Sequence, residues 1–328
     1  MTRSGWVQDV LGPSYERLEL PLGQDAEGPV VATLVRRRWT PGDLLHLRGP
    51  LEGTDVLYVH GWSDYFFQTE LAERVERLGA RFHALDLRKY GRSLRPGQTP
   101  GGTDDLGVYD DDIRAALDAI AAEHHGPRRR LVPMGHSTGG LTLALWASRH
   151  RDLVDGLVLN SPWLEFQGDA VGRNLVAPLI RLGARRNPLA PIPAVDPGFY
   201  TRTVSSTGEG SWTYDQRWRP DRGFPLHPGW LAAVFAGQQT VEHGLGMPFP
   251  VLVMLSDKSM LQPRWNEGMA HADVALNVDA VARRALSLGD EVTVRRLRGA
   301  LHDVVLSEPA VRERAYDVIG RWAGTLLR

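Results

Sequence analysis

The sequence predicts an α/β fold: a mostly parallel, eight-stranded sheet with helices on both faces and an inserted cap. Short apolar runs alternate with helical patterns in two blocks of the chain, which is typical of a parallel sheet covered on both sides. Between the blocks lies a long stretch rich in proline, glycine and aromatic residues, and a structureless loop of that length would be unusual. We therefore expect a core made of residues 1–161 and 248–328, interrupted by a cap at residues 162–247.

The first block opens with two strands, at residues 18–22 and 28–38, and the turn GQDAEG between them predicts a hairpin. The run DVLYVHG at residues 55–61 is apolar in the manner of a strand buried on both faces. Residues 66–79 repeat leucine and valine at helical spacing and end in glycine, which predicts a helix. The remaining expected strands are 80–88, 129–135, 154–162, 249–255 and 291–297, and the remaining helices are 108–126, 141–150, 278–289 and 308–327.

The composition excludes several classes of partner and chemistry. The 38 basic and 39 acidic side chains give a formal net charge of −1, which indicates neither a nucleic-acid nor an anionic-membrane partner. The chain has no cysteine, so disulfides, thiolate metal sites and a cysteine nucleophile are excluded. No dense histidine spacing predicts a metal site, and we expect no cofactor. Because no apolar run resembles a signal peptide or a membrane span, we expect a cytoplasmic protein, with homo-oligomer formation left open.

One serine is notable for the residues around it. In PMGHSTGG, residues 133–140, Ser137 lies in the pattern G-x-S-x-G between an expected strand and an expected helix. Functional groups in a parallel sheet gather at the carboxyl ends of the strands, where this serine falls. A sharp turn tolerates no bulk at positions 135 and 139, and the helix that follows stabilises nearby negative charge. These features predict that Ser137 is a nucleophile.

A nucleophilic serine needs a base and an acid that orients the base, in the chain order serine, acid, histidine. His302 follows the last expected core strand and is the candidate base. Two aspartates are candidates for the acid: Asp257 ends the preceding strand, and Asp273 lies directly before the helix that precedes the last strand. The 29 positions from Asp273 to His302 favour Asp273, since a loop, a helix and a strand need about 25–30 residues. Asp257 stays an alternative.

The reaction also needs hydrogen-bond donors for a developing oxyanion. In this arrangement one backbone N–H comes from the residue after the nucleophile, Thr138, and another comes from the loop after an earlier strand. The sequence YVHGWSDYFF supplies that loop, in which Gly61 lets the chain turn and the N–H of Trp62 is the second expected donor. His60 would then support the loop rather than act as a base.

The segments HGWSDY, LDLRKYGRS, GHSTGG and GALHD occur in the order found in α/β-hydrolases. The chain resembles the serine aminopeptidase S33 and lysophospholipase branch of that superfamily and is similar to monoacylglycerol lipases. The resemblance covers most of residues 18–161 and 248–328 but not the cap. It implies four roles by residue: nucleophile Ser137, oxyanion donors Trp62 and Thr138, and base His302. The chain departs from such relatives at the acid, where LSDKSM…HAD is longer than their usual turn.

We therefore expect a serine hydrolase that cleaves carboxylic esters, of lipase, lysophospholipase or esterase type, through an acyl-enzyme. The aromatic-rich cap indicates a small-molecule substrate with an apolar acyl group, because binding pockets are lined mostly by apolar groups. The same triad could serve an aminopeptidase or a thioesterase, and the fold could also belong to a binding protein without turnover.

Overall fold

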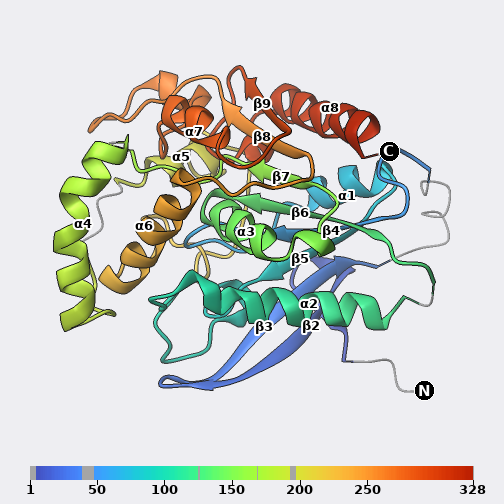
Figure 1. The fold of residues 1–328 in the computed structure, drawn as a ribbon, viewed down its shortest axis with the longest axis horizontal. Helices are drawn as coiled ribbons and strands as arrows, with labels where there is room; N and C mark the ends of the chain where they lie inside the picture. The colour runs from blue at the N-terminus through green and yellow to red at the C-terminus, as the bar shows by residue number, and fades with distance from the viewer. Residues whose placement is uncertain (1–4, 39–47, 125, 168, 193–196, 328) are drawn as a thin grey trace.

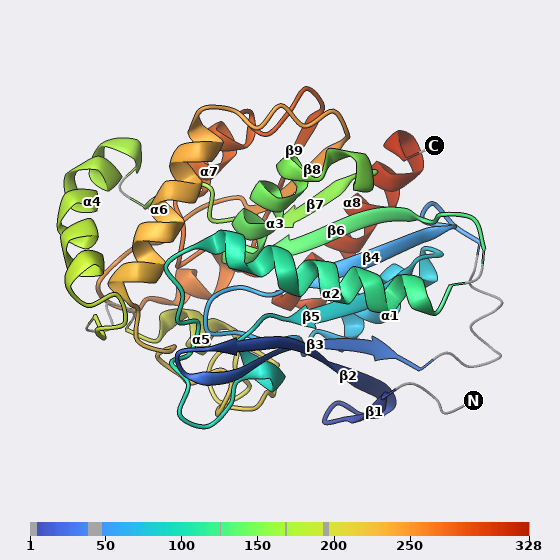
Figure 2. The ribbon, with the colours of Figure 1, turned by 60° about the horizontal axis from the view of Figure 1, so that its bottom comes forward.

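The computed structural model describes residues 5–38, 48–124, 126–167, 169–192 and 197–327. They contain a nine-stranded sheet with the spatial order β1-β2-β3-β5-β4-β6-β7-β8-β9 (Figure 1; β1 is labelled in Figure 2). The strands are β1 (Val7–Asp9), β2 (Gly12–Asp25), β3 (Gly28–Arg37), β4 (Thr54–Val59), β5 (Arg81–Asp86), β6 (Arg130–His136), β7 (Leu157–Asn160), β8 (Val251–Ser256) and β9 (Val292–Leu297). The β1–β2, β2–β3 and β3–β5 pairs are antiparallel, and the other pairs of the sheet are parallel. The predicted α/β class is therefore confirmed.

The sheet has one strand more than expected, at its edge. β1 is three residues long, and its Val7 pairs antiparallel with Arg17 of β2. Two of the three side chains in β1 are exposed, so the segment has no apolar alternation that a sequence pattern could detect. β2 also begins at Gly12 rather than near residue 18, because its first residues pair with β1 on one side and β3 on the other.

Helices cover both faces of the sheet (Figure 1, Figure 2). They are α1 (Thr69–Arg77), α2 (Tyr109–Ala122), α3 (Ser137–Arg149), α4 (Asp169–Arg186), α5 (Phe199–Val204), α6 (Pro228–Glu242), α7 (Val278–Ala285) and α8 (Pro309–Leu326). α1 and α8 bury apolar side chains in one cluster, whereas α2, α3 and α7 contribute to a second. Neighbouring residues of β4 alternate between the two, Leu57 in the second cluster and Tyr58 in the first. β4 is therefore buried on both faces, as its continuous apolar run predicts.

Three of the helices, α4, α5 and α6, lie in residues 162–247, between β7 and β8, and we call these residues the cap segment. Figure 2 shows α4 and α6 side by side outside the sheet layer. Buried Glu165 ties this segment to the core, since its carboxylate accepts hydrogen bonds from Arg173 of α4 at 2.5 Å and from Arg284 of α7, outside the segment, at 2.5 Å. Arg173 also pairs with Glu242 at the end of α6.

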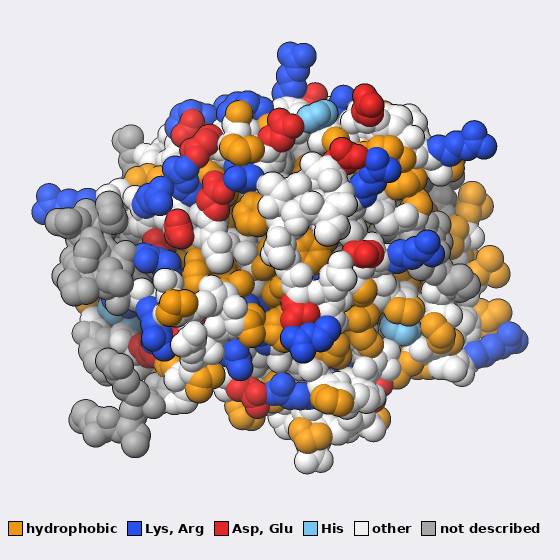
Figure 3. Space-filling view, turned by 180° about the vertical axis from the view of Figure 1, so that it is seen from behind, with side chains coloured by type: hydrophobic (Ala, Val, Ile, Leu, Met, Phe, Trp, Pro, Cys, Tyr) orange, Lys and Arg blue, Asp and Glu red, His pale blue; other side chains and the backbone are white. Residues whose placement is uncertain are grey.

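Charges of both signs are mixed on the face of the molecule that Figure 3 shows. Basic and acidic side chains there are interspersed rather than gathered into one patch. No described helix is both long and apolar enough to cross a bilayer. Within the part of the chain that the structure describes, His, Asp and Glu side chains form no group suited to hold a metal ion.

Candidate active site

The predicted nucleophile lies at a strained turn between β6 and α3. Ser137 has a φ of +52°, in the left-handed region that non-glycine residues seldom adopt. A Cβ atom built on Gly135 would lie 2.7 Å from the carbonyl oxygen of Gly139. One built on Gly139 would lie 2.2 Å from the carbonyl oxygen of His60. Neither glycine position has room for a side chain, and the turn places Ser137 at the carboxyl end of β6 and the first turn of α3.

Three side chains from distant parts of the sequence form a chain of hydrogen bonds at this turn. Ser137 Oγ lies 3.1 Å from His302 Nε2, and His302 Nδ1 lies 2.9 Å from Asp273 Oδ2. Because a carboxylate only accepts, Nδ1 carries the proton and donates to Asp273, which leaves Nε2 of the neutral ring to accept from the serine hydroxyl. The histidine and aspartate side chains are both buried. The structure thus brings together the predicted nucleophile, the predicted base and the favoured acid.

The long excursion after β8 explains how Asp273 reaches this place. Residues 258–272 leave the strand end and return to it, so that Asp273 forms an isolated parallel bridge with Ser259. Its N–H donates to the carbonyl oxygen of Lys258 at 3.0 Å. Asp273 therefore lies beside the extension of β8, although it comes 16 positions after Asp257 at the strand end.

The alternative acid faces another loop. Asp257 Oδ1 accepts a hydrogen bond from the N–H of Gly299 at 2.9 Å, which ties the end of β8 to the turn after β9. Asp273 uses its second oxygen in a different way, since Oδ1 accepts from the N–H groups of Ala275 and Leu276 at 2.8 Å each. These two bonds hold the carboxylate so that Oδ2 points at the imidazole.

Asp303, which the sequence analysis did not single out, anchors the loop that carries His302. Asp303 is fully buried and accepts a hydrogen bond from Asn160 Nδ2 at 2.6 Å. Asn160 is the last residue of β7, and its Oδ1 accepts from the N–H of Val304 at 3.1 Å. Gln68 Nε2, beside the start of α1, also donates to Asp303 at 3.4 Å. The only sequence signal was that Asp303 directly follows a candidate base, and no local pattern pairs it with Asn160.

The two predicted oxyanion donors come from the segments on either side of the nucleophile. Thr138 is the second residue of α3, and N–H groups in a first helical turn have no partner within the helix. A Cβ atom built on Gly61 would lie 3.1 Å from Ser137 Cβ, so the Gly61–Trp62 peptide runs directly beside Ser137. Donation from Thr138 and Trp62 to a substrate oxygen stays a prediction.

His60 braces the chain just before this peptide. The N–H of Leu87 donates to His60 Nε2 at 3.1 Å, so the proton is on Nδ1, which donates to the carbonyl oxygen of Gly61 at 2.7 Å. Burial lowers the pKa of His60, which keeps the ring neutral. With both ring nitrogens engaged, His60 fits the supporting role expected from the sequence.

The cap segment contributes a tyrosine next to the base. The ring of Tyr200, in α5, lies 5.1 Å from the His302 ring at an interplanar angle of 80°. Its hydroxyl is 3.2 Å from His136 Nε2, and His136 Nδ1 is 3.2 Å from the carbonyl oxygen of Asn160. Burial is the main cause that lowers the pKa of His136 to about 4. His136 is therefore neutral near pH 7, and it accepts a hydrogen bond from the Tyr200 hydroxyl.

The sequence matches the protein family described as serine aminopeptidase, S33, over residues 54–258, which is more than half of the 328-residue chain. The chain belongs to this family. The match starts with β4 and ends just after β8, so it includes the turn of Ser137 and the Gly61–Trp62 peptide beside it.

Solved structures share the overall architecture. The monoacylglycerol lipase of Paleococcus ferrophilus superposes with a TM-score of 0.60 at 18% identity, covering 83% of this chain and 94% of that chain. A soluble variant of monoglyceride lipase from Saccharomyces cerevisiae gives a TM-score of 0.61 at 16% identity, covering 94% and 96%. At these identities the likeness concerns the fold, and the expected α/β-hydrolase fold is confirmed.

Curated relatives match a shorter part of the chain. Probable esterase PIR7A from Oryza sativa subsp. indica is 32% identical over 128 residues, which are 38% of this chain and 44% of that protein. The AB hydrolase superfamily protein YisY from Bacillus subtilis (strain 168) is 30% identical over 112 residues, 33% of this chain and 38% of that protein. The chain thus spans less than half the length of these relatives.

Proposed function

We propose that this protein is a serine hydrolase that cleaves carboxylic esters through an acyl-enzyme, with Ser137 as nucleophile, His302 as base and Asp273 as orienting acid. The observation that carries the proposal is the unbroken chain of hydrogen bonds from Asp273 through His302 to Ser137, at 2.9 and 3.1 Å. The names of similar proteins, among them an esterase and two monoacylglycerol lipases, support an ester as the substrate.

Acylation begins when Ser137 Oγ attacks the ester carbonyl carbon and His302 Nε2 takes the hydroxyl proton. Asp273 accepts from Nδ1–H throughout and stabilises the imidazolium that forms. The carbonyl oxygen becomes an oxyanion, which receives hydrogen bonds from the N–H groups of Thr138 and Trp62, while the N-terminus of α3 favours negative charge there. His302 then gives its proton to the alcohol oxygen as the bond from carbon to that oxygen breaks. The acyl group stays on Ser137.

Deacylation repeats these steps with water in place of the serine. His302 Nε2 takes a proton from a water molecule, whose oxygen attacks the carbonyl carbon of the acyl-enzyme. The second oxyanion uses the same two donors. When it collapses, the proton returns from His302 to Ser137 Oγ, and the carboxylic acid leaves.

Aromatic side chains next to Ser137 support an apolar acyl group. The N–H of Trp163 donates to the carbonyl oxygen of Ser137 at 2.9 Å, so the backbone of Trp163 lies beside the nucleophile. The Trp163 ring lies 5.9 Å from that of Trp230 in α6, and the Trp230 ring lies 3.9 Å from that of Trp62. Trp163 and Trp230 are buried and Trp62 is only partly buried, so a bound ester would meet the Trp62 ring, and binding sites use such apolar surface for apolar ligands.

A fluorophosphonate probe tests the nucleophile, because it reacts only with an activated serine. We expect the probe to label the wild-type protein and to leave Ser137→Ala unlabelled. Ser148→Ala, in the same helix α3, is the matched control and should be labelled at the wild-type rate. An unlabelled wild type, or equal labelling of Ser137→Ala, would contradict the proposal.

A substrate panel separates the ester from the other bonds that such a triad could cleave. We expect turnover of p-nitrophenyl esters, with kcat/KM rising from acetyl to longer acyl chains. An aminoacyl p-nitroanilide and an acyl thioester serve as the competing substrates. A higher kcat/KM for the anilide or the thioester would replace the ester assignment by an aminopeptidase or a thioesterase with the same residues.

A further inference from the structure

A buried ion pair joins the loop before α1 to the cap segment. We call residues 60–68 the oxyanion loop, because they include Gly61 and Trp62. Asp64 of this loop and Arg219 of the cap segment are 2% and 3% exposed, and Arg219 Nε lies 3.2 Å from Asp64 Oδ1. Burial raises the pKa of Asp64 to about 7 even beside Arg219, so the pair is mostly ionised above that pH, and the buried guanidinium has this carboxylate as its charged partner. The pair therefore holds two segments distant in sequence in one relative position.

Aromatic rings enclose the Arg219 guanidinium. Its central carbon lies 4.4 Å from the ring centroid of Tyr214, 4.9 Å from that of Tyr200 and 5.8 Å from that of Phe67. The faces of such rings attract a cation, so they fix the guanidinium in a second way. Phe67 is itself part of the oxyanion loop, so Arg219 contacts that loop at two residues, Asp64 and Phe67.

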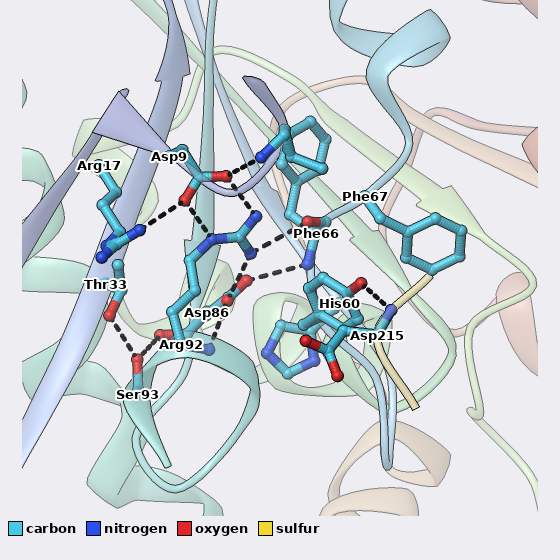
Figure 4. Close-up of polar contacts among 12 residues, drawn as sticks. Asp9, Arg17, Thr33, His60, Phe66, Phe67, Asp86, Arg92, Ser93 and Asp215 are labelled. Atoms are coloured by element: carbon cyan, nitrogen blue, oxygen red, sulfur yellow. Dashed lines mark hydrogen bonds and ion pairs between the residues drawn. The ribbon is translucent and has the colours of Figure 1, made fainter. Parts of the chain in front are cut away.

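The far end of the oxyanion loop is held by the core, as Figure 4 shows. The N–H of Phe66 donates to Asp86 Oδ1 at 2.9 Å, and Arg92 Nη1 donates to the carbonyl oxygen of Phe66 at 3.0 Å. Arg92 is buried between two carboxylates, with Asp9 2.7 Å and Asp86 2.8 Å from its nitrogens. This anchor lies four residues beyond Trp62, too far along the chain to set the Trp62 peptide by itself.

The near end of the loop, which includes the Trp62 peptide, contacts both the core and the cap segment. On the core side, His60 Nδ1 donates to the carbonyl oxygen of Gly61 at 2.7 Å, and the Trp62 ring lies 5.7 Å from that of Tyr90. Ser63 Oγ accepts from the N–H of Phe224 at 2.9 Å, and Trp62 Nε1 donates to the carbonyl oxygen of Phe224 at 3.4 Å. The Asp64–Arg219 pair is the charged contact in this set and follows Trp62 by two residues. The direction of the Trp62 N–H thus depends on the cap segment as well as on His60, which holds the carbonyl oxygen of the same peptide.

Arg219 is also linked to the base, through Tyr200. Arg219 packs on Tyr200, whose ring lies 5.1 Å from that of His302 and whose hydroxyl is 3.2 Å from His136 Nε2. A shift of the guanidinium would therefore displace a neighbour of the imidazole as well as the oxyanion loop.

We infer that Asp64 and Arg219 are positioning residues for the reaction: the pair sets the Trp62 N–H against Ser137 from one side and supports Tyr200 against His302 from the other. This role rests on the proposed ester hydrolysis and deepens it. The cap segment is then part of the machinery that stabilises the oxyanion, rather than only a cover over the substrate. No atom of the pair needs to touch the substrate.

The test is steady-state kinetics of Arg219→Met on a short p-nitrophenyl ester, with enzyme concentration set by fluorophosphonate titration. Because displacing an oxyanion donor acts on the transition state, we expect kcat to fall about 10- to 100-fold, with KM changed less than about threefold. Arg219→Lys keeps the charge and should recover part of the lost kcat. Arg217→Met is the matched control. Arg217 is an exposed arginine two positions before Arg219, and this variant should keep the wild-type kcat.

Asp64→Asn, assayed at pH 8, provides a second route if Arg219→Met does not fold, since it keeps the side-chain shape and removes a carboxylate charge that is mostly present at that pH. It should lower kcat in the same way, and the double variant should be no slower than the slower single variant, because both break one pair. Wild-type kcat in folded Arg219→Met or in Asp64→Asn would overturn the positioning role. Failure of the proposed function looks different, since the wild type itself would then neither react with the probe nor turn over the ester.

Discussion

The carboxylate of Asp273 binds the base through one oxygen and the backbone of the turn that follows it through the other. Oδ2 accepts from His302 Nδ1, and Oδ1 accepts from the N–H groups of Ala275 and Leu276. An asparagine offers only one oxygen for these two tasks. If that oxygen stays with the two N–H donors, the amide group faces His302 and donates to Nδ1. The imidazole proton then moves to Nε2, which can no longer accept from Ser137.

We therefore predict that Asp273→Asn lowers kcat by about 10³- to 10⁴-fold through the wrong histidine tautomer. Asp257→Asn is the matched control, because the remaining oxygen can still accept from Gly299 and no bond to His302 is involved. That variant should stay within about twofold of the wild-type kcat. The measurement is kcat on a p-nitrophenyl ester at pH 7–8 for both variants. A full loss in Asp257→Asn and none in Asp273→Asn would reverse the assignment of the acid.

At the scale of elements, the strand β6, its turn and α3 act as one rigid unit. Gly139 in the first turn of α3 lies so close to β4 that an added Cβ would be 2.2 Å from the carbonyl oxygen of His60 and 2.6 Å from that of Val59. Backbone atoms in the middle of a sheet cannot rotate away as a side chain can. A methyl group at this position must therefore push α3, and Ser137 with it, away from β4.

Gly139→Ala should thus destabilise the protein by about 1–3 kcal/mol, the usual cost of overpacking, and should reduce kcat strongly. Gly172→Ala is the matched control, because its nearest neighbour would be the Phe166 ring at 3.8 Å, an ordinary contact. Gly172 lies in α4, where alanine should leave kcat unchanged and raise the free energy of unfolding by about 0.5–1 kcal/mol. Urea unfolding and ester kinetics measure both effects. Equal outcomes for the two glycines would show that the tight contact at Gly139 does not constrain α3.

At the scale of the whole molecule, the parts of the fold that depend on local pattern could be predicted from the sequence. The buried strands and the glycines around Ser137 obey short-range rules, so β4, β6 and α3 occur where expected. The β1 strand cannot be predicted from its own residues, because two of its three side chains are exposed and only its pairing with β2 makes it a strand. The expected cap boundaries at residues 162 and 247 stay a prediction.

In the candidate site, too, some residues could be predicted from the sequence and others could not. Ser137 and His302 follow from chain order and strand ends, and the spacing of 29 positions favours Asp273, whose Oδ2 lies 2.9 Å from His302 Nδ1. The contacts of Arg219 could not be predicted, because the bond between Asp64 and Arg219 joins a loop of the core to an irregular segment 155 positions away. Such pairs depend on how the cap segment packs, and no periodicity in one sequence encodes that.

The stability of the whole molecule in acid depends on a histidine buried inside the sheet. His83, in β5, is buried among Arg36, Arg81 and Arg129, and its Nδ1 has no hydrogen-bond partner in the described part of the chain. Burial, followed by these three positive charges, lowers the pKa of His83 to about 3. In the unfolded chain the pKa returns to about 6.5. Between these values the unfolded state binds a proton that the folded state does not, so stability is lost as the pH falls from about 6.5 towards 3.

We predict that His83→Leu removes this dependence. From pH 7.5 to pH 4 the wild type should lose about 3 kcal/mol more unfolding free energy than the variant, since a shift of one pKa unit corresponds to about 1.4 kcal/mol. Asp64 and Asp112, whose pKa values burial raises to about 7 and about 6, act in the opposite direction, but both proteins contain them and they cancel in the difference. Urea unfolding at the two pH values measures the four free energies. Parallel losses in both proteins would mean that His83 is already protonated in the folded state or that the unfolded chain protects it equally.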